Sequence, residues 1–221
     1  MKLETIHKIS GKIRLLSGLH IGASKENIEI GGLDNPIIKD PLPGSHAPYI
    51  PGSSLKGKIR CLLELRHEKI SEKGKPCGCG QCDICAVFGS SSPDNRPEAL
   101  GPPRIVVRDA NLSEEWQSRF ERGELPMEVK YENSINRISG TAQNPRPLER
   151  VPAGVEFDFS ISLKKFKGDE DYLPLIYQGM KMLQYDALGG CGSRGCGQIE
   201  FVDVEVDGEK KDDNFLDEIE L

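Results

Sequence analysis

Apolar and polar residues alternate strictly over residues 8–15, the pattern of a strand that is half buried in a sheet. Isoleucine, glycine and leucine fall on one face and lysine, serine and arginine on the other, so the outer face of this strand is basic. Residues 157–163 alternate in the same way, with phenylalanine, isoleucine and leucine directed inward. Two further apolar segments, residues 104–110 and 198–206, also predict strands.

Two other segments have the spacing of helices. Apolar residues over 54–70 recur close to the helical period after a Pro-Gly turn, and Ser53 or Ser54 is expected to cap the start of this helix. Residues 172–188 predict a second helix, which ends at the glycine pair 189–190. Each helix lies between two predicted strands along the chain.

The resulting order of strand, helix, strand, strand, helix, strand predicts an α+β fold with a ferredoxin-like, RRM-type split βαβ core. Three long segments without periodicity interrupt this core, at about 18–53, 71–103 and 111–153. Loops of this length inside a compact domain are usually functional. We expect a single domain over residues 1–206.

The charge of the chain is unevenly distributed. A net charge of −6 over 221 residues argues weakly against a nucleic-acid partner. Residues 203–221 alone carry −7, however, and residues 37–75 hold eight lysines and arginines against four acidic residues. A local basic surface is therefore compatible with the sequence, and we expect the acidic segment 207–221 to be a solvated, mobile tail.

Neither a membrane nor an export route is indicated by the sequence. No apolar run approaches the roughly 18 residues of a membrane span, and the charged N-terminus has no apolar signal core. The chain is expected to be soluble, cytoplasmic and without a membrane partner. Four of its seven cysteines fall within nine residues, which indicates metal binding in a reducing compartment rather than a disulfide framework.

The cysteine cluster has the spacing C-x-C-x2-C-x2-C, with a histidine ten residues upstream. Thiolates separated by glycines can converge on a tetrahedral Zn²⁺, and four protein ligands imply a structural ion. The spacing fits four cysteines or three cysteines with the histidine, while an iron–sulfur cluster is disfavoured because no partner redox motif is present. Free buried thiols are the alternative. The five candidate ligands are His67, Cys77, Cys79, Cys82 and Cys85.

The start of the first predicted helix nearly matches a phosphate-binding P-loop. Gly52 and Gly57-Lys58 fit the spacing, but Ile59 stands where a Mg²⁺-binding serine or threonine is needed, so nucleotide hydrolysis is disfavoured. A helix start is still a good site for an RNA or DNA phosphate, although an ordinary capped helix explains the same spacing. The residues that would bind the phosphate are Ser53, Ser54 and Lys56.

Residues 189–197 contain five glycines, which let a backbone pass close to a ligand, and Arg194 adds a cation. Structural turns are the alternative explanation. His20, Asp34 and Arg137 are isolated polar residues in the long insertions, and spacing alone identifies no site there.

Six motifs occur together and in order: SGLHIG, GGLDNP, PYIPGSSLKGKIR, the cysteine cluster followed by AVFGS, YENSINRISGTAQ and GGCGSRGCG. In this combination the chain resembles the Csm-type backbone subunit of type III-A CRISPR effector complexes, in the RAMP superfamily, over about residues 5–206. The corresponding type III-B subunit is a weaker match, since the zinc-like insertion and modest length resemble the Csm type.

The resemblance implies several copies that polymerise along one guide RNA with other subunits and present the guide to complementary target RNA, which is cleaved at regular intervals. Asp34 aligns with the catalytic aspartate of the family, working with a divalent cation such as Mg²⁺ or Mn²⁺, and the region 130–150 resembles a thumb hairpin. A non-catalytic guide-RNA-binding scaffold is the alternative. The implied RNA contacts are His20, Ser53, Ser54, Lys56, Arg137, Gly190, Gly192, Ser193, Arg194 and Gly195.

Overall fold

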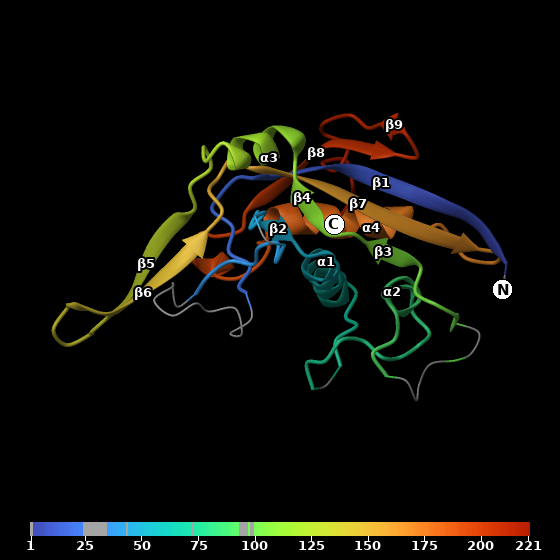
Figure 1. Ribbon diagram of the computed structural model, residues 1–221. Helices are drawn as coiled ribbons and strands as arrows, with labels where there is room; N and C mark the ends of the chain where they lie inside the picture. The colour runs from blue at the N-terminus through green and yellow to red at the C-terminus, as the bar shows by residue number, and fades with distance from the viewer. Residues whose placement is uncertain (1, 24–34, 43, 72, 93–96, 98–99) are drawn as a thin grey trace.

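The chain is organised around an antiparallel sheet in which β1 (Leu3–Leu15) is the central strand (Figure 1). β1 pairs with β7 (Glu156–Phe166) on one side and with β8 (Ile199–Val206) on the other. The two strands predicted by alternation and the apolar strand predicted over 198–206 are confirmed, and β1 and β7 are longer than their periodic segments. The computed structural model describes residues 2–23, 35–42, 44–71, 73–92, 97 and 100–221.

Short strands complete the sheet on both sides. The order is β2-β4-β7-β1-β8-β9, with β3 also paired to β7, and this order is compatible with the predicted ferredoxin-like arrangement. The strand predicted over 104–110 is broken in two, because the Asp109 carboxylate leaves the sheet to accept a hydrogen bond from the Gly52 amide at 2.7 Å. The short strands are β2 (Tyr49–Ile50), β3 (Ile105–Val107), β4 (Ala110–Leu112) and β9 (Glu209–Lys210).

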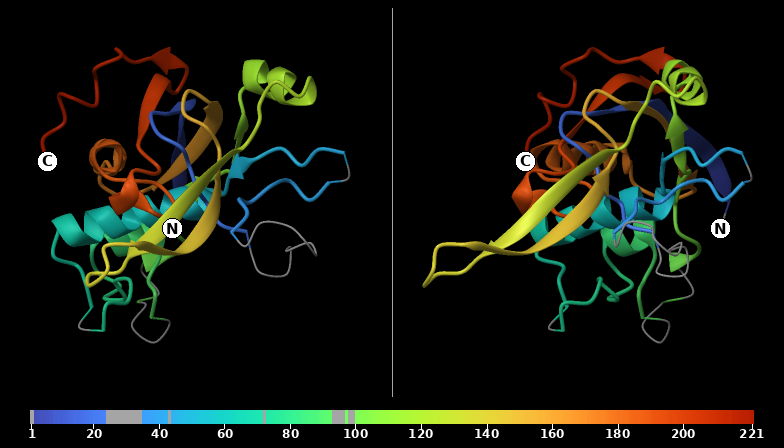
Figure 2. Two further views of the ribbon diagram at one scale, coloured as in Figure 1. Left: turned by 90° about the vertical axis from the view of Figure 1, so that its left-hand side faces the viewer. Right: turned by 60° about the vertical axis from the view of Figure 1, so that its left-hand side comes forward.

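Two long helices, α1 (Gly52–Arg66) and α4 (Leu173–Tyr185), pack against each other on one face of the sheet (Figure 2). Both end before their predicted limits. α1 stops because Glu68 adopts a left-handed backbone conformation with φ of 55°. Among the described residues, no helix combines the length and the apolar character that crossing a membrane requires.

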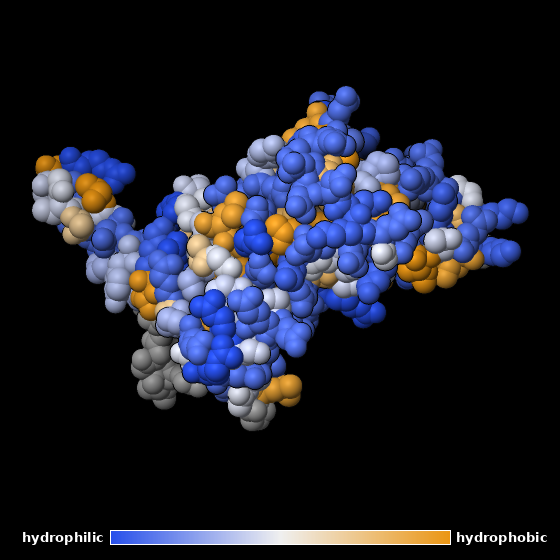
Figure 3. Space-filling model, turned by 90° about the horizontal axis from the view of Figure 1, so that it is seen from above, coloured by the Kyte–Doolittle hydropathy of each residue, from blue (hydrophilic) through white to orange (hydrophobic). Residues whose placement is uncertain are grey.

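The long insertions carry their own secondary structure. A short helix, α2 (Asp83–Phe88), follows the first cysteines, and α3 (Glu114–Glu121) follows β4. β5 (Glu128–Ile135) and β6 (Ala142–Arg150) form a separate two-stranded hairpin. Figure 3 shows this hairpin standing away from the body of the protein. The glycine-rich loop contains one 3-10 turn, Gly192–Arg194.

The acidic segment 207–221 is packed against α4, although its charge predicts a solvated, mobile tail. Leu216 is 3% exposed, and the rings of Phe215 and Tyr177 meet edge to face at 5.5 Å. The Lys181 ammonium donates to two backbone carbonyls of the segment, at 2.7 and 2.9 Å. The expectation rested on charge alone, but apolar side chains interrupt the acids and bury themselves on the helix while the acids face water.

Candidate nucleic-acid interface and metal centre

His20 lies where three distant segments meet. Its Nδ1 is 2.8 Å from the carbonyl of Glu149 at the end of β6, which makes this nitrogen the donor. The Gly190 amide donates to the His20 carbonyl at 2.8 Å. Gly189 has a left-handed φ of 76°, and a Cβ there would lie 2.4 Å from the same carbonyl. The glycine-rich loop therefore needs glycine in order to close on His20.

Asp34 lies outside the described residues, but the segment that follows it is fixed. The Glu149 amide donates to the carbonyl of Asn35 at 3.2 Å. The buried Glu149 carboxylate accepts from the Ile37 amide at 3.0 Å and from the Lys39 ammonium at 2.6 Å. The chain immediately after Asp34 is thus held by the same residue whose carbonyl binds the histidine ring.

An ion pair joins the glycine-rich loop to the hairpin. Arg194 Nε lies 2.8 Å from a carboxylate oxygen of Glu132, and Arg194 Nη2 donates to the Cys191 sulfur at 2.8 Å. The Lys130 ammonium donates to the Arg194 carbonyl at 2.6 Å. The hydrogen bond with Glu132 raises the pKa of Arg194 above its usual value. The guanidinium remains 56% exposed and open to a ligand.

A second arginine, Arg150, ties the base of the hairpin to the same loop. It is 9% exposed, bonds to Glu128, and donates from Nη1 to the Cys196 sulfur at 3.4 Å. A Cβ on Gly18 would lie 2.6 Å from Arg150 Nε, so only glycine fits beside it. Sequence reasoning missed Arg150 and Glu149, because no local pattern marks them as buried and their partners lie far away along the chain.

α1 brings the other candidate phosphate contacts to this region. The Lys58 ammonium pairs at 2.9 Å with Asp186, three residues before the glycine-rich loop, so the first turns of α1 lie close to this loop. The prediction that Ser53 or Ser54 caps α1 is wrong, because the helix begins at Gly52, before both serines. Pro51 is the N-cap residue, and it forms no side-chain cap bond. Both serines are therefore available, Ser53 being exposed.

Lys56 and Arg137 differ from the other candidate RNA contacts in their surroundings. Burial lowers the pKa of the Lys56 ammonium, and the neighbouring Arg60 charge adds to this effect. Arg137 is not gathered with the others. It lies in the turn of the hairpin, next to Ile138, whose side chain is fully exposed.

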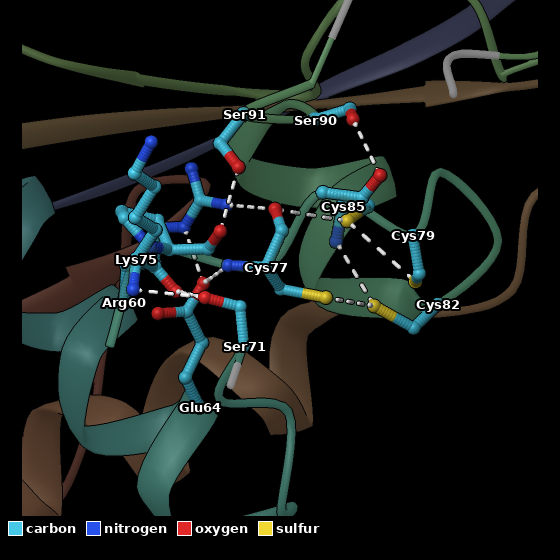
Figure 4. A network of polar contacts seen from close by, with 12 residues as sticks. Arg60, Glu64, Ser71, Lys75, Cys77, Cys79, Cys82, Cys85, Ser90 and Ser91 are labelled. Atoms are coloured by element: carbon cyan, nitrogen blue, oxygen red, sulfur yellow. Dashed lines mark hydrogen bonds and ion pairs between the residues drawn. The ribbon is translucent and has the colours of Figure 1, made fainter. Parts of the chain in front are cut away.

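The four clustered cysteines converge beside α2 (Figure 4). All four sulfurs lie within 4.8 Å of one another, with distances of 3.9 Å for both the 77–82 and 79–85 pairs. Four thiolates at about 2.3 Å from a tetrahedral Zn²⁺ would be about 3.8 Å apart. The cluster therefore has the dimensions of a four-thiolate metal site.

His67 is not part of this group. It caps the C-terminus of α1 through its amide, and its Nε2 donates to the Gln178 side chain at 2.8 Å. Of the five candidate ligands, the structure brings together only the four cysteines among its described residues.

The thiols of the cluster differ in acidity. Burial acts to raise the pKa of Cys79, but hydrogen bonds from the Gln81 backbone and from neighbouring cysteines outweigh it and lower the pKa to about 6. Burial raises the pKa of both Cys82 and Cys85. Binding of a cation would displace the remaining protons, because thiolates and not thiols are the metal ligands.

Comparison with known proteins agrees with the resemblance seen in the sequence. The profile of the RAMP superfamily matches residues 12–200. A protein of Methanothermobacter thermautotrophicus is 47% identical over 221 residues, covering 93% of this chain and 87% of the relative. A protein of Streptococcus thermophilus is 41% identical over 201 residues, covering 88% and 86%. Both relatives are named CRISPR system Cms endoribonuclease Csm3.

A solved structure gives the same answer for the fold. It is a chain of the crystal structure of a Csm3-Csm4 subcomplex in the type III-A CRISPR-Cas interference complex, with 32% sequence identity and a TM-score of 0.60. The similarity covers 93% of this chain and 80% of the other. The chain accordingly belongs to the RAMP superfamily and, within it, to the Csm3 family.

Proposed function

We propose that this chain is a backbone subunit of a type III-A CRISPR effector complex, which binds guide RNA along its length and cleaves complementary target RNA at regular intervals. The observation that carries the proposal is the meeting of His20, the glycine-rich loop and Glu149 beside Asn35, the residue after Asp34, in a chain 47% identical to a CRISPR endoribonuclease. A scaffold without catalysis would share the RNA-binding parts but would not need Asp34.

The RNA-binding residues suit a backbone reader. An exposed guanidinium on a glycine-rich loop and a helix start are suited to binding phosphates, while base pairing between guide and target supplies sequence specificity. The contacts proposed for each subunit are local, and copies repeat them along the guide. A net charge of −6 is therefore compatible with tight binding by the assembly of copies and other subunits.

Asp34 would act on the target strand. In-line attack by a 2′-hydroxyl on the adjacent phosphate breaks the bond to the 5′-oxygen and needs a base for the hydroxyl proton, a role suited to a carboxylate. A divalent cation, Mg²⁺ or Mn²⁺, would supply stabilisation of the charge that develops on the phosphate oxygens. The leaving 5′-oxygen takes a proton from water.

The test is cleavage of an end-labelled, guide-complementary RNA by the reconstituted complex with Mg²⁺. Wild type and Asp40→Ala, a control in the same insertion, are expected to give regularly spaced products, and Asp34→Ala to bind the RNA without cutting it. Intact, bound RNA with all three proteins would identify a scaffold. Loss of binding by Asp34→Ala would contradict a catalytic role.

We also infer that the four cysteines hold a structural Zn²⁺. Four thiolates leave no open position, as expected for a structural site, and give the occupied centre a charge of about −2. A cavity of about 770 Å³ beside Cys77 and Cys79 is lined by Lys69, Lys73 and Lys75, whose positive charges offset that of the centre. Free thiols of this kind persist in the reducing cytoplasm, where we expect the chain to act.

A further inference from the structure

Two side chains of α1 hold the backbone of one cysteine of the cluster. The Cys77 amide donates to Glu64 Oε1 at 2.8 Å, and Arg60 Nη2 donates to the Cys77 carbonyl at 2.8 Å. Arg60 Nε also donates to the same Glu64 oxygen at 2.7 Å. Figure 4 shows the three residues joined in one network. Both backbone polar groups of Cys77 are thus bound by one i, i+4 pair on a helix.

This ion pair is buried, which is unusual for a helix face that packs on the core. Glu64 is 6% exposed, like Cys77, and the Arg60 side chain is 15% exposed. Burying two charges costs free energy, and a well-packed apolar pair at the same positions is often as stable or more stable. A role in packing therefore does not account for the pair, whereas its two hydrogen bonds to the backbone of Cys77, a proposed metal ligand, do.

Cys77 is the ligand that needs such support. Cys82 is the N-cap of α2 and Cys85 lies in its first turn, so this helix fixes two of the four sulfurs. Cys77 instead follows a segment without helix or strand, residues 73–76. Its sulfur is placed only if its backbone is placed, and the described contacts that reach that backbone from outside the insertion come from α1.

We propose that Arg60 and Glu64 are positioning residues of the metal centre, which preorganise Cys77 and thereby set the metal affinity of the cluster. The inference rests on the zinc centre proposed above and adds a determinant outside the ligands. Residues that orient metal ligands typically change metal affinity by about 10- to 100-fold when they are substituted. Arg60 and Glu64 also connect the metal centre to α1, the helix whose first turns carry the proposed phosphate contacts.

Two substitutions separate the contribution of Glu64 to metal affinity from that of Arg60. Glu64→Gln keeps the size of the side chain but removes the charge that Arg60 and the Cys77 amide share. Arg60→Lys keeps a cation beside Glu64 but removes the second donor, which reaches the Cys77 carbonyl. Glu68→Gln is the matched control, because it makes the same change on an exposed glutamate four residues further along the chain.

The experiment measures Zn²⁺ and Co²⁺ affinity of the full reduced chain by competition with a chromophoric chelator. Glu64→Gln and Arg60→Lys are expected to bind both ions about 10- to 100-fold more weakly than wild type, and Glu68→Gln to match wild type. At saturation, the thiolate-to-Co²⁺ absorption of all variants should be that of four thiolates. A purely structural role would instead lower the melting temperature of the metal-free and metal-bound forms equally and leave affinity unchanged.

Each other outcome is decisive. Wild-type affinity in folded Glu64→Gln and Arg60→Lys overturns this inference while leaving the zinc centre intact. A wild-type chain that binds neither ion overturns the zinc centre and this inference with it. If Glu64→Gln does not fold, Arg60→Lys decides alone, since it retains the buried charge balance.

Discussion

Arg194 and Glu132 form an ion pair, with Nε and the carboxylate 2.8 Å apart, that connects the glycine-rich loop to the projecting hairpin. The carboxylate is 21% exposed and the guanidinium 56% exposed. A phosphate that reaches the loop competes with Glu132 for the same guanidinium. If Arg194 contacts guide RNA as proposed, the hairpin and the guide strand would be alternative partners of its guanidinium.

Arg194→Gln is expected to weaken binding of guide RNA. Loss of one phosphate contact should lower the slope of log affinity against log salt concentration by about 1. Fluorescence anisotropy of labelled guide RNA with the assembled subunits, at several salt concentrations, measures both quantities. Arg122→Gln is the control, because this guanidinium is 57% exposed and also pairs with a single carboxylate, that of Glu124. Equal slopes for the two variants would exclude a phosphate contact by Arg194.

Removal of the metal is expected to destabilise the chain. Free Zn²⁺ at about 1,000 times its dissociation constant stabilises the folded state by about 4 kcal/mol. This corresponds to about 8–16 °C in melting temperature for a domain of this size. Metal analysis should find one zinc per wild-type chain, and calorimetry should show this shift on chelation.

Two cysteine variants test where that zinc is bound. Cys82→Ser should lose the ion and melt like the chelated wild type. Cys61→Ser changes an exposed thiol of α1 outside the cluster and should keep both the zinc and the melting temperature. Retention of zinc by Cys82→Ser would contradict the four-cysteine site.

Local periodicity was sufficient to predict the main elements of the fold. β1 and β7 alternate because one face of each packs on the helices, and that alternation is visible in the sequence. The break in the strand at 104–110 was not predictable, since it depends on the bond between Asp109 and Gly52, 57 residues apart in the chain.

The same limit applies to the candidate site. Cysteine spacing indicated a metal but could not choose between His67 and a fourth thiolate, because the partner of His67 is Gln178, 111 residues away. Glu149 reads as a surface charge in the sequence, and only the structure buries it against Ile37, 112 residues earlier. Spacing and composition indicated the helix start and the glycine-rich loop with Arg194 as candidate phosphate sites, whereas His20 and Arg137 came from the family resemblance alone.

Gly179→Ala is expected to destabilise the contact between α1 and α4. A Cβ at this position would lie 2.5 Å from Ile59 Cγ2 and 3.1 Å from Leu63 Cδ1, so the two helices must separate. Overpacking of this kind costs about 1–3 kcal/mol of unfolding free energy. Gly57→Ala is the matched helical control: its Cβ meets nothing within 4 Å, and we expect a gain of about 0.5–1 kcal/mol. Urea denaturation of both variants measures the loss of unfolding free energy expected for Gly179→Ala and the gain expected for Gly57→Ala. Equal effects of the two substitutions would exclude close packing at Gly179.

The last prediction concerns the buried pair of Arg104 and Asp169, whose side chains are 6% and 10% exposed. Two hydrogen bonds join them, at 2.8 and 3.0 Å, and the Phe166 amide also donates to the carboxylate at 3.0 Å. Hydrogen bonding from Arg104 lowers the pKa of Asp169 against the opposing effect of burial. A carboxylate with a lowered folded-state pKa contributes stability above its unfolded value of about 3.9, and this contribution is lost as the pH falls through the folded value.

Asp169→Asn should therefore lower the unfolding free energy by about 3–5 kcal/mol at pH 7, because it leaves the Arg104 charge buried without a counterion. The difference from wild type should be constant between pH 7 and about 5 and begin to shrink at lower pH, as Asp169 of the unfolded wild-type chain takes up a proton that the folded chain binds only at still lower pH. Urea denaturation at pH 7, 5.5 and 4 measures it. Asp203→Asn is the control, because the pKa of Asp203 is also lowered, by hydrogen bonding from Lys210, yet both side chains are more than half exposed and water screens their attraction. A wild-type stability in Asp169→Asn at pH 7, or a deficit equal to that of Asp203→Asn, would show that the buried pair does not stabilise the fold.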